Sequence, residues 1–467
     1  MADQLQKVIL GFGGGLATDF GPSFTSAPQN GALIIPWAVA ADNLTWELDG
    51  GPHKVGGTSR LNTTQIQVGT NTVHGFFDAW YQGTIGSETQ KQWANIGTSL
   101  YSMDALDGTW DSQLTGLEDS KQPHFFMAKD IGIFSSDSNT DVPQRLPVGL
   151  TVANLLGSPP NFAFGTWHQN RAWAAGVASN PSRLYYSASL DPEDWTGAGS
   201  GSIDIDPEDG DRLTGIWPHR NELIVFKGPN KLSIHRITGS APTGSAAFAR
   251  TPFVKGISAI NMNGIGTVGD DVVFASPRGL HSLAATAAFG DYIEAFLSRP
   301  ILSYYQNNLN HNTLGETWMA NWAQKGLAVW TFAKSGGTAK NVILVYDYRF
   351  QPGRWSTWGR TTAYLNCHSL AIMQQTRIHR LYAGTTTGFV SRIGDVADQR
   401  LDGSTAYTAE FKWPFLNFGS SATMKTAHGG WASMAAKGDY NVTIGWSRDR
   451  NAEETAAVNQ GGGDTLT

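Results

Sequence analysis

The stretch Leu223–Ile234 reads Leu-Ile-Val-Phe-Lys-Gly-Pro-Asn-Lys-Leu-Ser-Ile. An apolar run of four residues leads into a Gly-Pro-Asn turn, and a second short apolar run follows. Because branched and aromatic residues favour strands and Gly, Pro and Asn favour turns, this stretch predicts a β-hairpin. Similar hairpins recur along the middle of the chain, with turns near residues 130, 180, 278, 336 and 386.

The spacing of these hairpins predicts the fold class. With the turn near residue 229 included, successive turns lie 50, 49, 49, 58 and 50 residues apart. A period near 50 with about four strands per unit is typical of an all-β protein of the β-propeller type, and a β-sandwich lacks such a long period. Six hairpins predict six blades. A further hairpin, Trp93–Tyr101, lies only about 32 residues before the first turn; we assign it to the blade that closes the ring, and it leaves seven blades open.

The composition supports a β-rich protein. Of the 467 residues only 15% are charged, 11% are aromatic, and there are 54 glycines and 17 tryptophans. Disordered chains have high charge and few aromatics, and glycine is unfavourable inside helices. The clearest helix candidate is 291–309, where Pro300 predicts a kink or an early stop.

Three regions follow from this pattern. Residues 1–60 are rich in glycine and predict an extended N-terminal arm that contacts a neighbouring subunit. Residues 61–400 are assigned to the propeller, and residues 401–467 to C-terminal strands that close or flank it, ending in a flexible tail. The candidate arm residues are Gly11, Gly13, Gly14, Gly15 and Leu16.

Charge and cysteine content exclude several classes of protein. The chain has 33 basic and 39 acidic residues, a net charge of −6, which disfavours a reader of nucleic-acid sequence. Its single cysteine, Cys367, cannot form an internal disulfide and indicates a reducing compartment. No secretory signal is expected. The longest apolar stretch, 32–41, contains Pro36 and is too short to span a bilayer.

A second pattern pairs tyrosine with tryptophan. In three places a Tyr is followed nine residues later by a Trp, with turn-forming residues between them. We predict that these tryptophans pack between blades, with ligand stacking as the alternative. The pairs are Tyr101 with Trp110, Tyr186 with Trp195, and Tyr346 with Trp355.

An acidic segment stands out between two predicted hairpins. Five carboxylates fall within eight residues, which could chelate calcium, form a solvated turn or provide an acidic rim. For calcium, the glycine lies one place away from the usual spacing and Pro207 stiffens the loop. The acids are Asp204, Asp206, Glu208, Asp209 and Asp211.

Motifs for catalysis are weak. Gly264–Gly269 has three glycines in the dinucleotide pattern, but a strand-like run follows where a helix is required, so these glycines predict turns. The histidines lack metal-ligand spacing. Ser102–Trp110 resembles the Asp box of sialidase propellers but is one residue too long. We therefore expect no enzyme activity, no metal and no cofactor, although an active site assembled from distant blades stays open.

The central region resembles a known family. Six segments are similar in sequence to the tail nozzle, or tail-stabilisation, proteins of short-tailed bacteriophages. They are Asn180–Ser187, Asp191–Trp195, Ile203–Asp211, Leu213–Ile216, Asn221–Lys227 and Ile234–Gly239. The best similarity covers residues 160–290. Gly14-Gly15-Leu16 is also similar to the opening arm of that family.

This resemblance implies a structural role in the virion tail. Such proteins are six-bladed propellers that form a homohexameric tube below the portal adaptor ring. The tube retains genome DNA and conducts it during ejection, without sequence-specific binding, and offers surface to tail fibre, needle or tip proteins. Synthesis is then expected in the host cytoplasm. The five acids of 204–211 would line the lumen, where they would repel the DNA backbone and allow it to slide.

Two other functions compete with this one. Aromatic residues in propeller loops could stack on sugars, which would make the chain a carbohydrate-binding or receptor-binding propeller. A glycoside-hydrolysing propeller would require two carboxylates that face each other across a pocket.

Overall fold

The computed structural model describes most of the chain. The described residues are 7–19, 32–46, 51–67, 69, 71–83, 86–138, 140–149, 151–284, 296–359, 366–394, 401–402, 405–413, 440–446 and 454–460. The chain divides into two compact units. The larger comprises Leu10–Asp19 and Pro36–Lys412, and the smaller comprises Met1–Ile9, Phe20–Ile35 and Trp413–Thr467.

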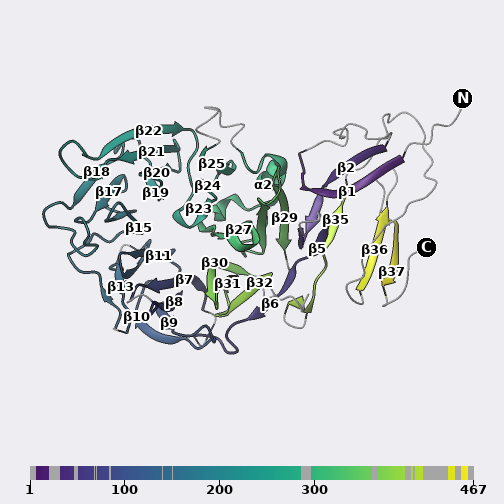
Figure 1. Cartoon of the computed structure of the whole chain (residues 1–467), viewed down its shortest axis with the longest axis horizontal. Coiled ribbons are helices and arrows are strands. Elements are labelled where there is room, and N and C mark those ends of the chain that lie inside the picture. The colour runs from purple at the N-terminus through teal and green to yellow at the C-terminus, as the bar shows by residue number, and fades with distance from the viewer. Residues whose placement is uncertain are drawn as a thin grey trace, which may run out of the picture. The chain divides into compact units, whose positions relative to one another are not determined.

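The larger unit contains a seven-bladed β-propeller (Figure 1). Blades 1 to 4 each have four antiparallel strands. Blade 1 is β7 (Val73–Tyr81), β8 (Thr89–Ile96), β9 (Ser99–Met103) and β10 (Asp111–Thr115); blade 2 is β11 (Pro123–Ala128), β12 (Ile131–Ser136), β13 (Gln144–Leu146) and β14 (Ala153–Asn154); blade 3 is β15 (Phe164–His168), β16 (Arg171–Ala175), β17 (Arg183–Tyr186) and β18 (Gly201–Asp204); blade 4 is β19 (Arg212–His219), β20 (Glu222–Gly228), β21 (Ser233–Thr238) and β22 (Ala249–Lys255).

The last three blades are less regular. Blade 5 has three strands among the described residues, and additional strands pair with the edges of blades 6 and 7. Blade 5 is β23 (Ile265–Val268), β24 (Asp271–Ser276) and β25 (Gly279–Ser282); blade 6 is β26 (Met319–Trp322), β27 (Leu327–Phe332), β28 (Val342–Asp347) and β29 (Arg354–Gly359), extended by β3 (Ala40–Asp42) and β35 (Glu410–Lys412); blade 7 is β30 (Cys367–Gln375), β31 (Ile378–Thr385), β32 (Val390–Gly394) and β6 (Gly56–Arg60), extended by β33 (Leu401–Asp402) and β34 (Thr405–Ala406).

The first strand of each blade lies innermost, and each inner strand contacts its neighbour around the ring, with β30 against β7. The blades pack face to face, so the middle strands are buried on both sides. Apolar residues along these strands therefore need not alternate with polar ones. In β27 all six residues from Leu327 to Phe332 are buried. Tryptophans fill the spaces between sheets, and Trp93, Trp173 and Trp330 are at most 1% exposed.

The ring is closed by a strand from near the N-terminus. Residues 56–60 form β6, which pairs antiparallel with β32 and brings Arg60 opposite Ser391. From the sequence, these residues were expected to belong to the extended arm. They instead supply the fourth strand of blade 7, because β32 would otherwise leave an unpaired edge.

The blade count differs from the expected six. Trp93–Tyr101 belongs to blade 1 and not to the closing blade. The spacing was misleading because the turn at Lys129–Asp130 joins the first and second strands of blade 2. The turn near residue 229 joins the second and third strands of blade 4. Hairpins of both kinds look alike in sequence, so one blade was missed.

Helix is scarce in the described residues. The candidate at 291–309 yields a 3₁₀ turn, η2 (Arg299–Ile301), and one short helix, α2 (Leu302–Asn308), because Pro300 falls in the turn that precedes the helix. The part of this candidate before residue 296 lies outside the described residues. The other 3₁₀ turns are η1 (Met262–Gly264), η3 (His311–Glu316) and η4 (Ala323–Lys325).

Three two-stranded sheets lie outside the blades. They are β1 (Lys7–Leu16) with β2 (Ala32–Ala38), β4 (Leu44–Trp46) with β5 (Pro52–Lys54), and β36 (Tyr440–Trp446) with β37 (Glu454–Gln460). The β36–β37 hairpin gives the smaller unit strands within the C-terminal region where they were predicted.

Candidate functional site

The acidic segment 204–211 connects β18, the outermost strand of blade 3, to β19, the innermost strand of blade 4. Asp204 lies at the end of β18 and accepts hydrogen bonds from Arg183 at 2.7 and 3.0 Å. Asp206 pairs with Arg250 of β22. In each case the hydrogen bond from arginine holds the pKa of the aspartate below its usual value. Both acids therefore have a cationic partner within the chain.

The next acids surround a buried lysine. The Lys227 side chain is 0% exposed, and its Nζ lies 2.7 Å from an oxygen of Asp209. The same Nζ donates to the backbone carbonyls of Ile205 and Asp206, each at 2.7 Å. All three N–H donors of the ammonium are thus used, as a buried charge requires.

Asp211 fixes the turn after β20. It is 2% exposed and accepts hydrogen bonds from the backbone N–H groups of Asn230, Lys231 and Leu232 at 2.7 to 3.1 Å. Burial alone would raise the pKa of Asp211, but these three donors lower it below the ordinary value. Asp211 therefore ties the connector to the β20–β21 turn.

The structure thus shows that four of the five predicted lumen acids make contacts within their own chain. Glu208 is exposed. No group of three or more His, Cys, Asp or Glu side chains is arranged to hold a metal ion within the described ranges. The connector lies beside outer strands of blades 3 and 4. Whether it faces the lumen of an assembly stays a prediction.

The three predicted packing tryptophans occupy different places. Trp355 lies in β29 directly opposite Tyr346, with ring centroids 4.8 Å apart, and is 1% exposed. Trp195 is buried in the loop after β17 and packs on Phe162. Trp110 is partly buried against the cluster shared by blades 1 and 7. Their nine-residue spacing from tyrosine therefore produces a cross-strand pair only in blade 6.

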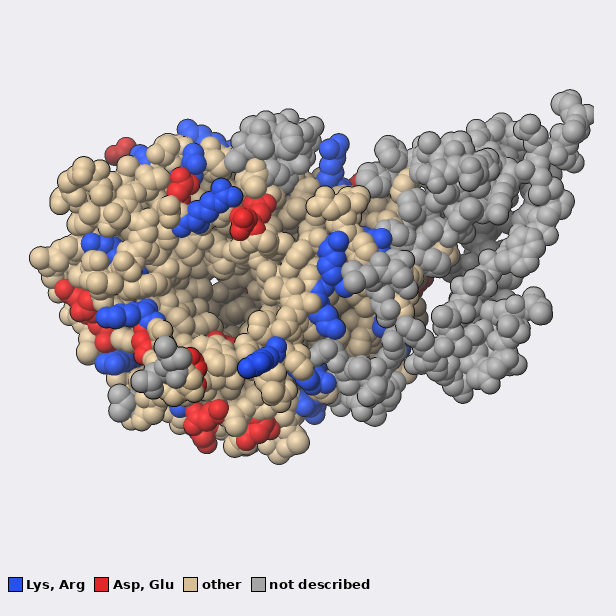
Figure 2. Space-filling model, viewed as in Figure 1, with Lys and Arg blue, Asp and Glu red and all other residues tan. Residues whose placement is uncertain are grey.

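The propeller axis is crossed by side chains at one end. Asn263, which precedes blade 5, donates to the carbonyl of Pro123 at 3.0 Å and to Gln122 Oε1 at 3.2 Å, and both belong to the start of blade 2. Its Oδ1 also lies 3.2 Å from His124 Nδ1. Blades 2 and 5 are not neighbours, so these contacts reach across the centre. Figure 2 shows a hollow at the middle of the face in view.

Trp318 makes a further contact between blades that are not neighbours. A Cβ atom at Gly75 of β7 would lie 2.6 Å from Pro123 and 2.8 Å from the ring of Trp318, which precedes blade 6. Glycine at this position therefore permits blades 1, 2 and 6 to approach one another. Neither Asn263 nor Trp318 carried a sequence signal that distinguished it from other loop residues.

At the opposite end, hydrogen bonds join every pair of neighbouring blades. Here the turns between first and second strands lie together. At each junction, at least one hydrogen bond joins a side chain of one blade to the neighbouring blade. In order around the ring the pairs are Gln82–Asp130, Lys129–Leu190, Gln169–Asn221, Trp217–Thr267, Thr267–Asn321, Gln324–Arg377 and Gln374–Asp78. This end of the propeller is therefore a continuous bonded ring.

The glycines of the predicted arm lie in or beside β1. Gly11, Gly13 and Gly14 belong to β1 with Gly15 and Leu16. Gly15 has φ +70°, and a Cβ there would lie 2.9 Å from the backbone nitrogen of Trp355. Leu16 is 2% exposed and belongs to the core cluster of Trp355. Gly15 and Leu16 thus pack on the chain's own blade 6, whereas an arm to another subunit was expected.

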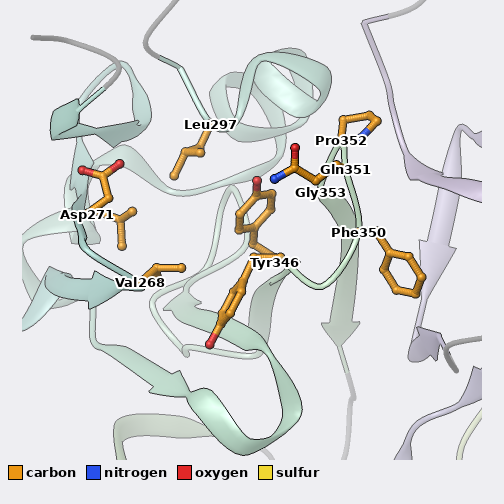
Figure 3. A pocket seen from close by; sticks show the side chains of 10 residues that line it. Val268, Asp271, Leu297, Tyr346, Phe350, Gln351, Pro352 and Gly353 are labelled. Carbon is orange, nitrogen blue, oxygen red and sulfur yellow. The ribbon is translucent and has the colours of Figure 1, made fainter. Parts of the chain in front are cut away.

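A cavity of about 410 Å³ lies between blades 5 and 6 (Figure 3). One side is formed by β23 and β24 with Asp271, and the other by β28 and the turn that leads to β29. The lining residues are Val268, Asp271, Val273, Leu297, Tyr346, Tyr348, Phe350, Gln351, Pro352 and Gly353. Asp271 is the one carboxylate among them.

The glycine-rich motif Gly264–Gly269 reaches the edge of this cavity. Gly264 ends η1, Gly266 lies within β23, and Gly269 has φ +60° in the turn to β24. A strand therefore follows the glycines, as their sequence context indicated.

Comparisons with known proteins identify no family for this chain. No protein-family model matches the sequence, and no curated protein matches it. Among solved structures, a chain of "Crystal Structure of Mitotic Checkpoint Complex" is similar with a TM-score of 0.43 and 10% identity, over 73% of this chain and 98% of that chain. YCF48 from Cyanidioschyzon merolae is similar with a TM-score of 0.39 and 10% identity, over 72% of this chain and 98% of that chain.

No described helix is long and apolar enough to cross a membrane.

Proposed function

We propose that this chain is a structural virion protein of a short-tailed bacteriophage, assembled as a homohexameric ring below the portal adaptor. In this role the ring retains genome DNA and then conducts it, and its outer surface holds fibre, needle or tip proteins. The observation that carries the proposal is the family-like wording of 180–239. Those residues form the outer two strands of blade 3, the first three strands of blade 4 and the acidic connector between them.

The crossed axis supports a conduit made by several copies. Contacts of Asn263 with blade 2 and of Trp318 with blade 1 join blades that are not neighbours across one end of a single propeller. A duplex therefore requires a path between copies, as a closed ring with heterologous contacts provides. The bonded ring of blade junctions at the other end favours a propeller that serves as a rigid building block.

A hydrolytic role has less support. Glycosidases use two carboxylates on either side of the scissile bond. Among the described residues that line the cavity between blades 5 and 6, Asp271 is the one carboxylate. Four of the five acids of the connector are engaged with arginine, lysine or backbone partners, and the fifth, Glu208, is exposed. The proposal therefore assigns no enzymatic role to this chain.

Assembly provides the direct test. The full chain is measured by multi-angle light scattering and negative-stain imaging, alone and with the portal adaptor ring. Rings of six copies, formed alone or on the adaptor, are expected. A monomer in both samples would contradict the proposal.

Lumen lining requires a separate test that spares the fold. Glu208→Lys changes the exposed acid of the connector, and Asp270→Lys is its control in the β23–β24 turn at the opposite end of the propeller. If the connector faces the lumen, Glu208→Lys slows DNA ejection from virions and Asp270→Lys does not. Equal ejection rates would place the connector elsewhere.

A further inference from the structure

We propose that the cavity between blades 5 and 6 binds a neutral saccharide. The proposal depends on one propeller only and therefore stands apart from the hexameric ring. The cavity has a volume of about 410 Å³, which falls in the lower part of the range of roughly 300–1,000 Å³ that is typical of small-molecule sites.

The cavity offers an aromatic wall. Tyr346 stands in β28, supported from behind by Trp355 at 4.8 Å. Gly353 permits this position, because a Cβ there would lie 2.3 to 2.4 Å from the Tyr346 ring and hydroxyl. In Figure 3, Tyr346 and Gln351 lie on one side of the cavity and Asp271 on the other, whereas Phe350 points away. An aromatic face with polar groups around it is suited to the C–H face and hydroxyls of a sugar ring.

The polar groups are of mixed type. No described residue forms a hydrogen bond with the Tyr346 hydroxyl or with the Gln351 side-chain amide. Tyr348 donates its hydroxyl proton to Asn321 at 3.0 Å, and its oxygen can still accept. Phenol and amide groups both donate and accept, which matches a sugar hydroxyl.

Asp271 is held in place on the opposite side. One of its oxygens accepts the hydroxyl proton of Ser282, and the other accepts the backbone N–H of Ala284 at 2.8 Å. Each oxygen keeps further acceptor capacity for a ligand hydroxyl. The carboxylate is therefore oriented before a ligand arrives, which lowers the cost of binding.

The charge of the lining selects among ligands. No lysine or arginine is among the described residues that line the cavity, so phosphates and acidic sugars would meet Asp271 without a compensating cation from them. A ligand ammonium or guanidinium would pair with Asp271 but would itself offer no acceptor to the amide donors of Gln351. A neutral saccharide uses donors and acceptors together.

The experiment uses saturation-transfer NMR of the full chain with neutral mono- and disaccharides. N-acetylneuraminate and methylguanidinium serve as anionic and cationic probes. The variants are Tyr346→Phe, which keeps the ring, and Gln351→Ala in the exposed turn. Tyr186→Phe is the matched control, because Tyr186 packs on Trp173 at 5.2 Å in blade 3, away from the cavity.

We expect at least one neutral saccharide to bind, with the dissociation constant raised about 2- to 10-fold by each cavity variant, as for one lost hydrogen bond. Tyr186→Phe should leave it unchanged. The proposal is overturned if no neutral saccharide binds, if only a charged probe binds, or if binding persists unaltered in both cavity variants. Because a monomer suffices for this test, failure of hexamer formation would not affect its outcome.

Discussion

The junction between blades 3 and 4 and the junction between blades 5 and 6 are both interfaces between neighbouring blades, but they are filled differently. In the first, Lys227, Asp209 and Asp211 are buried or nearly so, and their polar atoms are paired. In the second, the polar groups of Tyr346 and Gln351 face a cavity. The difference teaches that charge alone does not mark a binding site, since the most acidic connector is largely occupied by its own chain.

The largest expected effect is at the filled junction. Lys227→Met removes the cation that holds Asp209 and two backbone carbonyls inside the blade interface. Breaking a buried pair while leaving its partner costs about 3–5 kcal/mol of the free energy of unfolding. Urea unfolding measures this loss. Lys231→Met, at an exposed side chain four residues away, should change stability by less than about 0.5 kcal/mol; equal losses would mean that burial is not the cause.

Asp211→Asn should weaken the same junction by about 2 kcal/mol at neutral pH, since its carboxylate accepts three backbone N–H groups. The pKa of Asp211 is lowered in the folded state. Its contribution is therefore present above the unfolded pKa near 3.9 and lost as pH falls through the folded pKa. Unfolding curves at pH 6 and pH 3 should show the gap between wild type and variant narrowing at the lower pH. A constant gap would contradict this assignment.

The open junction should respond to added volume. Gly353→Ala places a methyl group within 2.4 Å of Tyr346, so the ring must shift toward the cavity. We expect a loss of about 1–2 kcal/mol by thermal or urea unfolding. Gly337→Ala in the same blade meets its nearest atom at 3.6 Å and should have little effect. A neutral Gly353→Ala would show that the Tyr346 side chain is not held against the turn.

The smallest effect is expected at the edge of the filled junction. Arg183 and Asp204 form a bidentate pair, but their side chains are 37% and 47% exposed. Such pairs contribute little to stability because solvent and salt screen them. Arg183→Gln should therefore change the urea midpoint slightly, and added salt should reduce the difference further. A loss as large as that of Lys227→Met would remove the distinction between the edge and the interior of the junction.

The propeller could be predicted from the sequence because apolar hairpins with Gly-Pro-Asn or Gly-Gly turns repeat at a nearly constant spacing. The number of blades was predicted one too low because turns between first and second strands resemble turns between second and third strands. The acids of 204–211 were identified but their partners were not, since nothing in the sequence distinguishes Lys227 from other residues beside a turn. The contacts of Asn263 with blade 2 span about 140 residues of chain. Such pairings depend on ring closure and have no local pattern.

The ring can close only after most of the chain has been synthesised, because the two strands that close it lie far apart in the sequence. Arg60 of β6 pairs with Ser391 of β32, so one partner waits while 331 further residues are added. At about 5–20 residues per second this delay is roughly 15–65 s. During it, the inner strand of blade 1, β7, lacks its neighbour, β30, and the apolar face of blade 1 that packs on blade 7 stays exposed. Nascent chains halted before residue 367 should therefore be captured by chaperones far more readily than the finished protein.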